Sequence, residues 1–201
     1  MELLVNKVVS SMVQIIIFAL VPFVWWIITA RKKCGFANWI GLKKVEGGKK
    51  TAFAIAVVSC VFVLIGAFTL YVLKDVEMAT SEFKGLGIGA VPAIIVYAIF
   101  NTALPEEILF RGFLLKRISN KFGFVTANTI QAFIFGVMHG FMFDSYVGMV
   151  KTILITGFTM VVAWFMGYIN EKKANESIIP SWIVHSIANI FSGICAAFSI
   201  F

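Results

Sequence analysis

VPAIIVYAIFNTALPEEILFRGFLLKR, residues 91–117, places two carboxylates and a guanidinium within one of the most apolar parts of the chain. The apolar stretch around it, residues 85–116, is longer than the roughly 20 residues that one membrane crossing needs. Pro105 lacks a backbone donor and crowds the preceding turn, so we expect an interruption of this helix near Pro105. Each charged side chain at mid-bilayer costs about 2.5–3.5 kcal/mol, so three of them in six residues indicate a functional use.

The whole chain has the composition of a membrane protein. Of its 201 residues, 60% are hydrophobic and 13% are charged, whereas about 45–50% of an ordinary soluble domain is apolar. The first apolar stretch is too long for a signal peptide and ends in basic residues, so we expect it to remain as a membrane anchor. We predict one all-α domain, residues 1–201, which forms a polytopic helical bundle with about six transmembrane spans at residues 8–30, 51–73, 85–116, 124–143, 147–169 and 177–200.

The basic residues predict the topology of this bundle. Of the 17 Lys and Arg side chains, twelve lie in three alternate loops, 31–50, 116–123 and 170–176. The positive-inside rule places these loops in the cytoplasm and both termini outside. Topology thus accounts for the net charge of +7, and no nucleic-acid partner is expected. The three cysteines are far apart and have no metal-binding spacing.

The charged residues of the quoted stretch divide into a pair and a single carboxylate. Glu107 and Arg111 are four residues apart, the spacing that brings two side chains together on one face of a helix. We expect a charge-assisted pair that neutralises both groups where water is scarce. Glu106 is turned about 100° away on the helix and lacks that partner. It is therefore the carboxylate that we expect to carry chemistry.

Two later spans each carry one polar stripe, and each stripe contains one of the two histidines. Polar faces in a bilayer turn toward one another or toward a water-filled cavity. We therefore expect Glu106, His139, His185 and Asn189 to converge in a cavity below the cytoplasmic surface. Within the first stripe, the two amides either line this cavity or bind neighbouring helices. The stripes consist of Asn128, Gln131, Phe135 and His139, and of Ser181, His185, Asn189 and Ser192.

These residue types are suited to hydrolysis. A carboxylate removed from bulk water can act as a general base, and imidazole or amide groups can hold a water molecule or donate to an oxyanion. The sequence contains no serine elbow, cysteine signature or HExxH motif, so water is the expected nucleophile. Glu106, His139 and His185 equally match a zinc ligand set with an open position. The residues alone leave the two alternatives open.

Three segments resemble motifs of a known family. EEILFR (106–111), FGVMH (135–139) and HSIAN (185–189) are similar to the EExxxR, FxxxH and HxxxN motifs of the CAAX-protease and bacteriocin-processing (CPBP/Abi) family of intramembrane endopeptidases. The resemblance implies that residues 85–201 form the protease core and that residues 1–84 add two family-variable helices.

The same resemblance implies roles for single residues. Glu106 would activate water together with His139, while His185 and Asn189 would stabilise the oxyanion. Glu107, Arg111 and Phe135 would brace the site. The family has been described both as metal-dependent and as a metal-independent glutamate protease; we favour no metal cofactor and keep zinc as the alternative.

The sequence thus predicts an intramembrane endopeptidase that cleaves a peptide bond near the cytoplasmic membrane face. The resemblance implies prenylated CAAX tails as substrates of eukaryotic relatives, and peptide pheromones, bacteriocin precursors or membrane-protein remnants as substrates of bacterial ones. Because we expect a bacterial protein, a prenylated substrate is disfavoured. We expect a bacterial cell membrane, a cavity open toward the cytoplasm, and membrane lipids and a peptide or membrane-protein substrate as partners; the oligomeric state is not predicted. The alternative is a non-catalytic immunity or scaffold protein that binds a peptide in the same cavity. A small transporter is disfavoured because no inverted repeat is visible.

Overall fold

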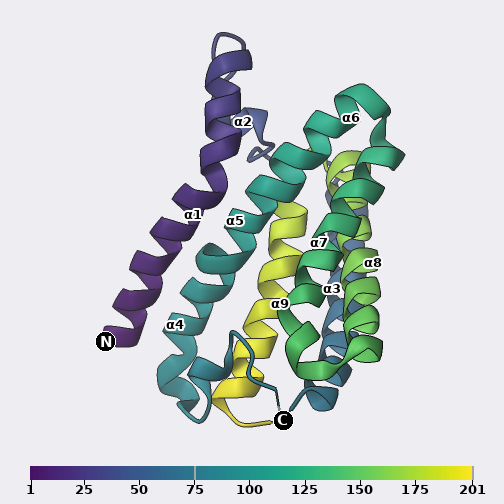
Figure 1. Cartoon of the computed structure of the whole chain (residues 1–201). Coiled ribbons are helices and arrows are strands. Elements are labelled where there is room, and N and C mark those ends of the chain that lie inside the picture. The colour runs from purple at the N-terminus through teal and green to yellow at the C-terminus, as the bar shows by residue number, and fades with distance from the viewer. Residues whose placement is uncertain (75, 201) are drawn as a thin grey trace.

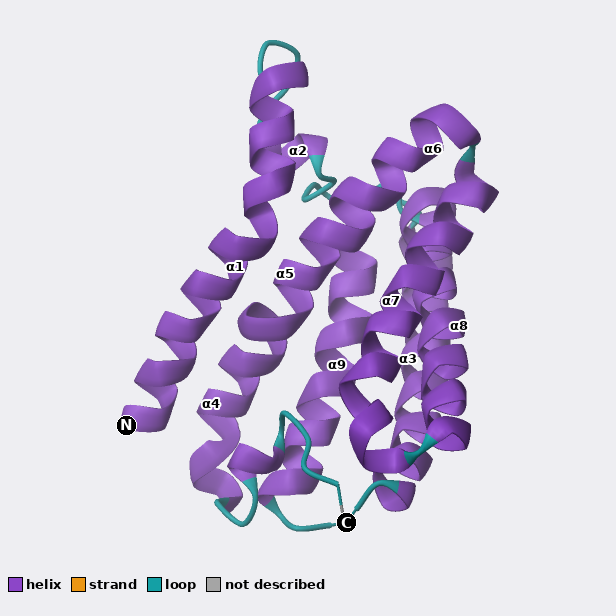
Figure 2. Cartoon of the chain, in the orientation of Figure 1, coloured by secondary structure: helices purple, strands orange, loops and turns teal. Residues whose placement is uncertain are grey.

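The computed structural model describes residues 1–74 and 76–200, and these form one helical bundle (Figure 1). Asp75 and Phe201 belong to the predicted domain 1–201 but lie outside the described residues. Within the described part of the chain there are helices and loops and no strands (Figure 2). Six helices there are long and apolar enough to cross a membrane, so the predicted all-α class and the six spans are confirmed: Glu2–Thr29 (α1), Gly48–Val72 (α3), Gly87–Phe122, Phe124–Val147 (α7), Met149–Lys173 (α8) and Ile179–Ala197 (α9). Two short helices, α2 (Phe36–Trp39) and η1 (Ser81–Phe83), lie in the connections.

The third span changes its hydrogen-bonding pattern along its length. Its segments are η2 (Gly87–Ala90), α4 (Val91–Val96), η3 (Tyr97–Ala103), α5 (Leu104–Glu107), η4 (Ile108–Leu115) and α6 (Lys116–Phe122). η3 and η4 are π-helical, with one more residue in each hydrogen-bonded turn than an α-helix, and Pro105 lies in the first turn of α5 between them. The backbone stays helical through Pro105 and changes only its hydrogen-bonding pattern. A kink of the helix axis at Pro105 stays a prediction.

The three basic loops meet at one end of the bundle. There Ser177 Oγ donates to the backbone oxygen of Lys43 (2.7 Å), and Lys116 Nζ donates to Glu171 Oε1 (2.8 Å) and to the backbone oxygen of Glu176 (2.9 Å). The two ends of the chain lie at the opposite end of the bundle (Figure 1). The loops therefore alternate between two ends as predicted. Which end faces the cytoplasm stays a prediction.

α1 is attached to the third span and to η1 through one of its faces. Ser10 Oγ and the Asn101 side chain exchange hydrogen bonds (2.9 and 3.2 Å). Lys7 Nζ forms an ion pair with Glu82 (2.6 Å) and lies 5.2 Å from the centre of the Tyr97 ring. Most of the remaining surface of α1 is exposed and apolar, as expected for a helix that faces lipid.

α7 and α8 pack closely along polar and small residues. Asn128 Nδ2 donates to the backbone oxygen of Trp164 (2.8 Å), and Gln131 Nε2 donates to that of Ala163 (3.2 Å). A side chain at Gly167 would collide with the Asn128 amide. Asn128 and Gln131 therefore bind the neighbouring helix, which is one of the two alternatives predicted, and they do not line the cavity described below.

Gly136 gives a test of this close packing. A Cβ atom there would lie 2.6 Å from the backbone oxygen of Thr156, which cannot move without distorting α8. We expect Gly136→Ala to lower the free energy of unfolding by about 1–3 kcal/mol, the usual cost of overpacking. Gly157→Ala is the matched control, because that position has open space and alanine favours a helix. Thermal unfolding of both variants in detergent measures this difference, and we expect the lower midpoint for Gly136→Ala. Equal midpoints would contradict the close packing of α7 against α8.

Candidate active site

A buried ion pair lies at the centre of the bundle. Glu107 and Arg111 are both completely buried, and Arg111 Nη1 donates to Glu107 Oε1 at 3.0 Å. The predicted pair is therefore present. Burying two charges requires good geometry and further hydrogen bonds, because desolvation is costly. The Arg111 guanidinium also lies over the Phe135 ring, 4.3 Å from the ring centre. This cation–π contact stabilises the guanidinium in addition to its bond with Glu107.

Glu107 makes two further contacts that the sequence did not predict. His185 Nδ1 lies 3.1 Å from Glu107 Oε1, and Ser181 Oγ donates to Glu107 Oε2 at 2.5 Å. An ionised carboxylate only accepts hydrogen bonds, so Nδ1 of His185 carries the proton. Arg111, His185 and Ser181 come from two different helices, η4 and α9, and all three converge on this one carboxylate.

Glu106 lies next to this network and is not part of it. Its Oε2 atom lies 3.8 Å from His185 Nε2, which is beyond a direct hydrogen bond. This oxygen is buried and has no hydrogen-bond partner among the described residues, although 16% of the Glu106 side chain is exposed. Glu106 is thus the carboxylate left without a donor, whereas its neighbour Glu107 has three.

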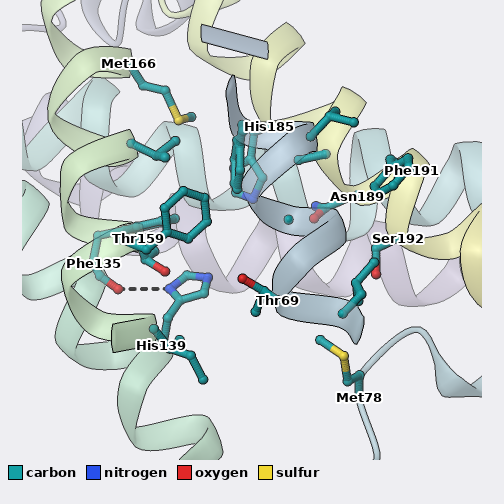
Figure 3. A pocket seen from close by; sticks show the side chains of 18 of the residues that line it. Thr69, Met78, Phe135, His139, Thr159, Met166, His185, Asn189, Phe191 and Ser192 are labelled. Carbon is teal, nitrogen blue, oxygen red and sulfur yellow. Dashed lines mark hydrogen bonds between the residues drawn. The ribbon is translucent and has the colours of Figure 1, made fainter. Parts of the chain in front are cut away.

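His139 faces a cavity from α7. Its Nδ1 atom lies 2.9 Å from the backbone oxygen of Phe135, one turn earlier, so Nδ1 carries the proton and Nε2 is left as an acceptor. The Phe135 ring contacts the imidazoles of both His139 and His185, with ring centres 4.4 and 5.9 Å away. Figure 3 shows Phe135 between the two imidazoles. Phe135 therefore separates the two histidines and shapes the space that they share.

Asn189 is held by a residue that sequence reasoning missed. Asn189 Nδ2 donates to Thr102 Oγ1 at 2.7 Å, which joins α9 to η3. Thr102 lies four residues before Glu106, one helical turn away. That i, i+4 spacing is the signal that would have placed Thr102 at the site.

Three of the four residues predicted to converge meet around a cavity of about 190 Å³ between α3, α7, α8 and α9. His139, His185 and Asn189 line it, together with Phe135 (Figure 3). Glu106 is not among the residues that line the cavity, and its Oε2 atom lies 3.8 Å from Nε2 of His185, which does line it. Apart from a few hydroxyl groups, the remaining wall is apolar, and it includes Phe62, Val63, Leu70, Phe143, Ile155, Phe158, Val162 and Phe191.

One end of this cavity points away from the basic loops. Met78, in the loop after α3, forms part of the wall together with Thr69 and Ser192. This loop lies at the same end of the bundle as the two termini (Figure 1). If the basic loops face the cytoplasm, the Met78 side of the cavity faces outward. The end at which the cavity opens, and with it the predicted opening toward the cytoplasm, stays a prediction.

The alternative zinc ligand set can be compared with the geometry. Among residues 1–74 and 76–200, no group of three or more His, Cys, Asp or Glu side chains is arranged to hold a metal ion. Glu106, His139 and His185 therefore do not form a three-ligand set in this conformation.

The part of the chain that carries the three motifs matches a known protein family. Residues 88–191, just over half of the 201-residue chain, match the family described as type II CAAX prenyl endopeptidase Rce1-like. The chain belongs to this family. This Rce1-like assignment confirms the resemblance noted in the three motifs, all of which lie inside the matched residues. Together with the six apolar helices, it identifies an integral membrane protein and supports CAAX-type protease activity in general.

No curated protein and no solved structure gave a significant match. The Rce1-like match begins after α3 and leaves out the first two spans. The division into two family-variable helices and a protease core stays a prediction.

Proposed function

We propose that this chain is an intramembrane endopeptidase in which Glu106 activates a water molecule for attack on a peptide bond. The supporting observation is the buried Glu106 Oε2, which lacks a partner among the described residues and lies 3.8 Å from His185 Nε2. A carboxylate oxygen that no protein donor occupies is suited to take a proton from water. Family membership supports protease activity in general, and this geometry adds a candidate base.

The hydrolysis would proceed in two steps. The water oxygen forms a bond to the carbonyl carbon while one water proton passes to Glu106, and the carbonyl oxygen takes the negative charge. The tetrahedral intermediate then collapses, the carbon–nitrogen bond breaks, and Glu106 returns the proton to the leaving amine. His139 would orient the water, because its Nε2 atom is left free as an acceptor.

His185 and Asn189 would stabilise the oxyanion. An imidazolium at position 185 donates from both nitrogens, to Glu107 at Nδ1 and to the oxyanion at Nε2. The Asn189 amide donates one hydrogen to Thr102 and has a second one to offer. Donors that are fixed in place before the reaction stabilise the developing charge without reorganisation. Glu107, Arg111 and Phe135 would brace these groups.

The walls of the cavity suggest the kind of substrate. Most of the lining consists of aromatic and aliphatic side chains, so the cavity is suited to an apolar side chain of a peptide or membrane protein next to the cleaved bond. Such a substrate would reach the site from the surrounding lipid. The proposed partners are thus membrane lipids and an apolar peptide segment.

We further propose that cleavage requires no metal. In the described residues, Glu106, His139 and His185 are not arranged as a three-ligand set for zinc. We therefore expect chelation by EDTA or 1,10-phenanthroline to leave the rate unchanged, measured on a membrane-inserted peptide library with purified protein in vesicles. Loss of cleavage that added zinc restores would contradict the metal-free mechanism, because zinc then supplies the activated water.

A further inference from the structure

Behind the ion pair lies a second layer of buried polar groups that has no role in the steps above. Asn170 of α8 and Ser181 of α9 are both completely buried. Asn170 Nδ2 donates to Ser181 Oγ at 2.7 Å, and Asn170 Oδ1 accepts from the Ser181 backbone nitrogen at 3.1 Å. These two bonds determine which side of the amide is nitrogen and which is oxygen. They also hold the beginning of α9 against the end of α8.

The Ser181 hydroxyl, which Asn170 holds in place, in turn orients the Glu107 carboxylate. A hydroxyl has one proton to donate and two positions that accept. Asn170 occupies an accepting position, and the proton is directed to Glu107 Oε2 at 2.5 Å, with the Ile178 backbone oxygen as a longer alternative at 3.0 Å. Glu107 Oε2 is therefore held by Ser181, while Oε1 is left for Arg111 and His185.

We propose that Ser181 and Asn170 are positioning residues for His185, which they control through the rotation of the Glu107 carboxylate. The proposal rests on the proposed function. Arg111 already neutralises the charge of Glu107, so the Ser181 hydrogen bond is not needed for charge balance. It is needed to keep Oε1 in the direction of His185 Nδ1, and that contact fixes the imidazole with Nε2 toward Glu106.

The first test requires no substrate. The chain has only two histidines, so protein labelled with ¹⁵N-histidine and purified through a histidine-free tag gives ring signals from His139 and His185 alone. His139→Ala assigns them. In the wild type we expect a hydrogen-bonded Nδ1 proton on His185. Ser181→Ala should shift or broaden the His185 signals and leave those of His139 unchanged. Ser186→Ala is the matched control: it removes a buried hydroxyl from the same helix outside this network.

The second test measures kinetics with the library peptide that the wild type cleaves fastest. Ser181→Ala should lower kcat about 10-fold, at the lower limit for the loss of an orienting partner, and leave KM unchanged. If Ser181→Ala does not fold, Asn170→Asp replaces it. A carboxylate at position 170 still accepts from the Ser181 backbone but attracts the hydroxyl proton away from Glu107, so the same changes are expected.

The outcomes separate this proposal from the proposed function. The positioning role of Ser181 would be overturned if Ser181→Ala and Ser186→Ala gave the same His185 signals and the same kcat. A raised KM with unchanged kcat in Ser181→Ala would also overturn it. If the wild type and Glu106→Gln cleave equally well, the proposed function fails. The ring signals of His185 then still decide whether Ser181 positions it.

Discussion

Glu106→Gln should abolish most of the peptide cleavage while the protein stays folded. The amide has nearly the shape of the carboxylate but cannot take a proton from water, so we expect the rate to fall by about 10²–10⁴-fold, the usual contribution of a general base. Stability should change little, because Glu106 Oε2 has no partner among the described residues and the side chain is partly exposed. Cleavage of the library peptide and thermal unfolding would be measured on the same preparation.

Glu176→Gln is the matched control for this variant. It makes the same chemical change at a loop carboxylate whose ion pair with Lys43 is long, at 3.9 Å. Its rate should equal that of the wild type. Undiminished turnover in Glu106→Gln would remove Glu106 from the role of base. A parallel loss in both variants would show that the assay responds to charge on the protein and not to the site.

Arg111→Ala should have the largest effect on stability. It leaves Glu107 as a completely buried carboxylate without its cation, and breaking such a pair by removing one partner costs about 3–5 kcal/mol. The substitution also removes the guanidinium from the Phe135 ring. We expect a greatly lowered unfolding midpoint, or protein that is degraded before purification, measured by thermal unfolding in detergent and by the yield from membranes.

Lys43→Ala provides the comparison for Arg111→Ala. It removes the cation of the partly exposed pair with Glu176, and exposed pairs contribute about 0–1 kcal/mol. The midpoint should therefore stay close to that of the wild type. If Arg111→Ala were as stable as Lys43→Ala, the claim that the Glu107–Arg111 pair is needed for the stability of the bundle would be wrong.

The sequence was sufficient to predict the spans and one side-chain contact. Six apolar stretches predict six helices because a bilayer leaves the backbone few alternatives. The Glu107–Arg111 pair was predictable because both residues lie on one helix, where spacing determines distance. The presence of π-helical segments on both sides of Pro105 was not, since no residue type in the sequence specifies a π-turn.

Contacts between helices were harder to predict. Polar stripes indicated that His185 and Asn189 face inward, but not that Glu107 holds the first and Thr102 the second. Asn170 was missed because a single amide near the end of an apolar helix has no periodic pattern to mark it. Such contacts depend on the rotation and axial position of each helix against its neighbours, which one sequence does not contain.

The position of the cavity could also be predicted only in part from the sequence. The polar stripes predicted a cavity below the cytoplasmic surface. A polar stripe contains no information about the end at which such a cavity opens. The side chains of α3 and of the loop with Met78 form part of the cavity wall, and neither segment carries a motif.

The most direct measurement compares two purified proteins in vesicles that contain the same membrane-inserted peptide library: the wild type and the double variant Glu106→Gln/His139→Ala. Mass spectrometry would count new peptide ends, and water enriched in ¹⁸O would label each new carboxylate. We predict labelled ends with the wild type and none above background with the double variant. Equal numbers of ends in both samples, or none in either while the peptides still bind, would contradict hydrolysis at this site; the second result would favour a binding protein instead.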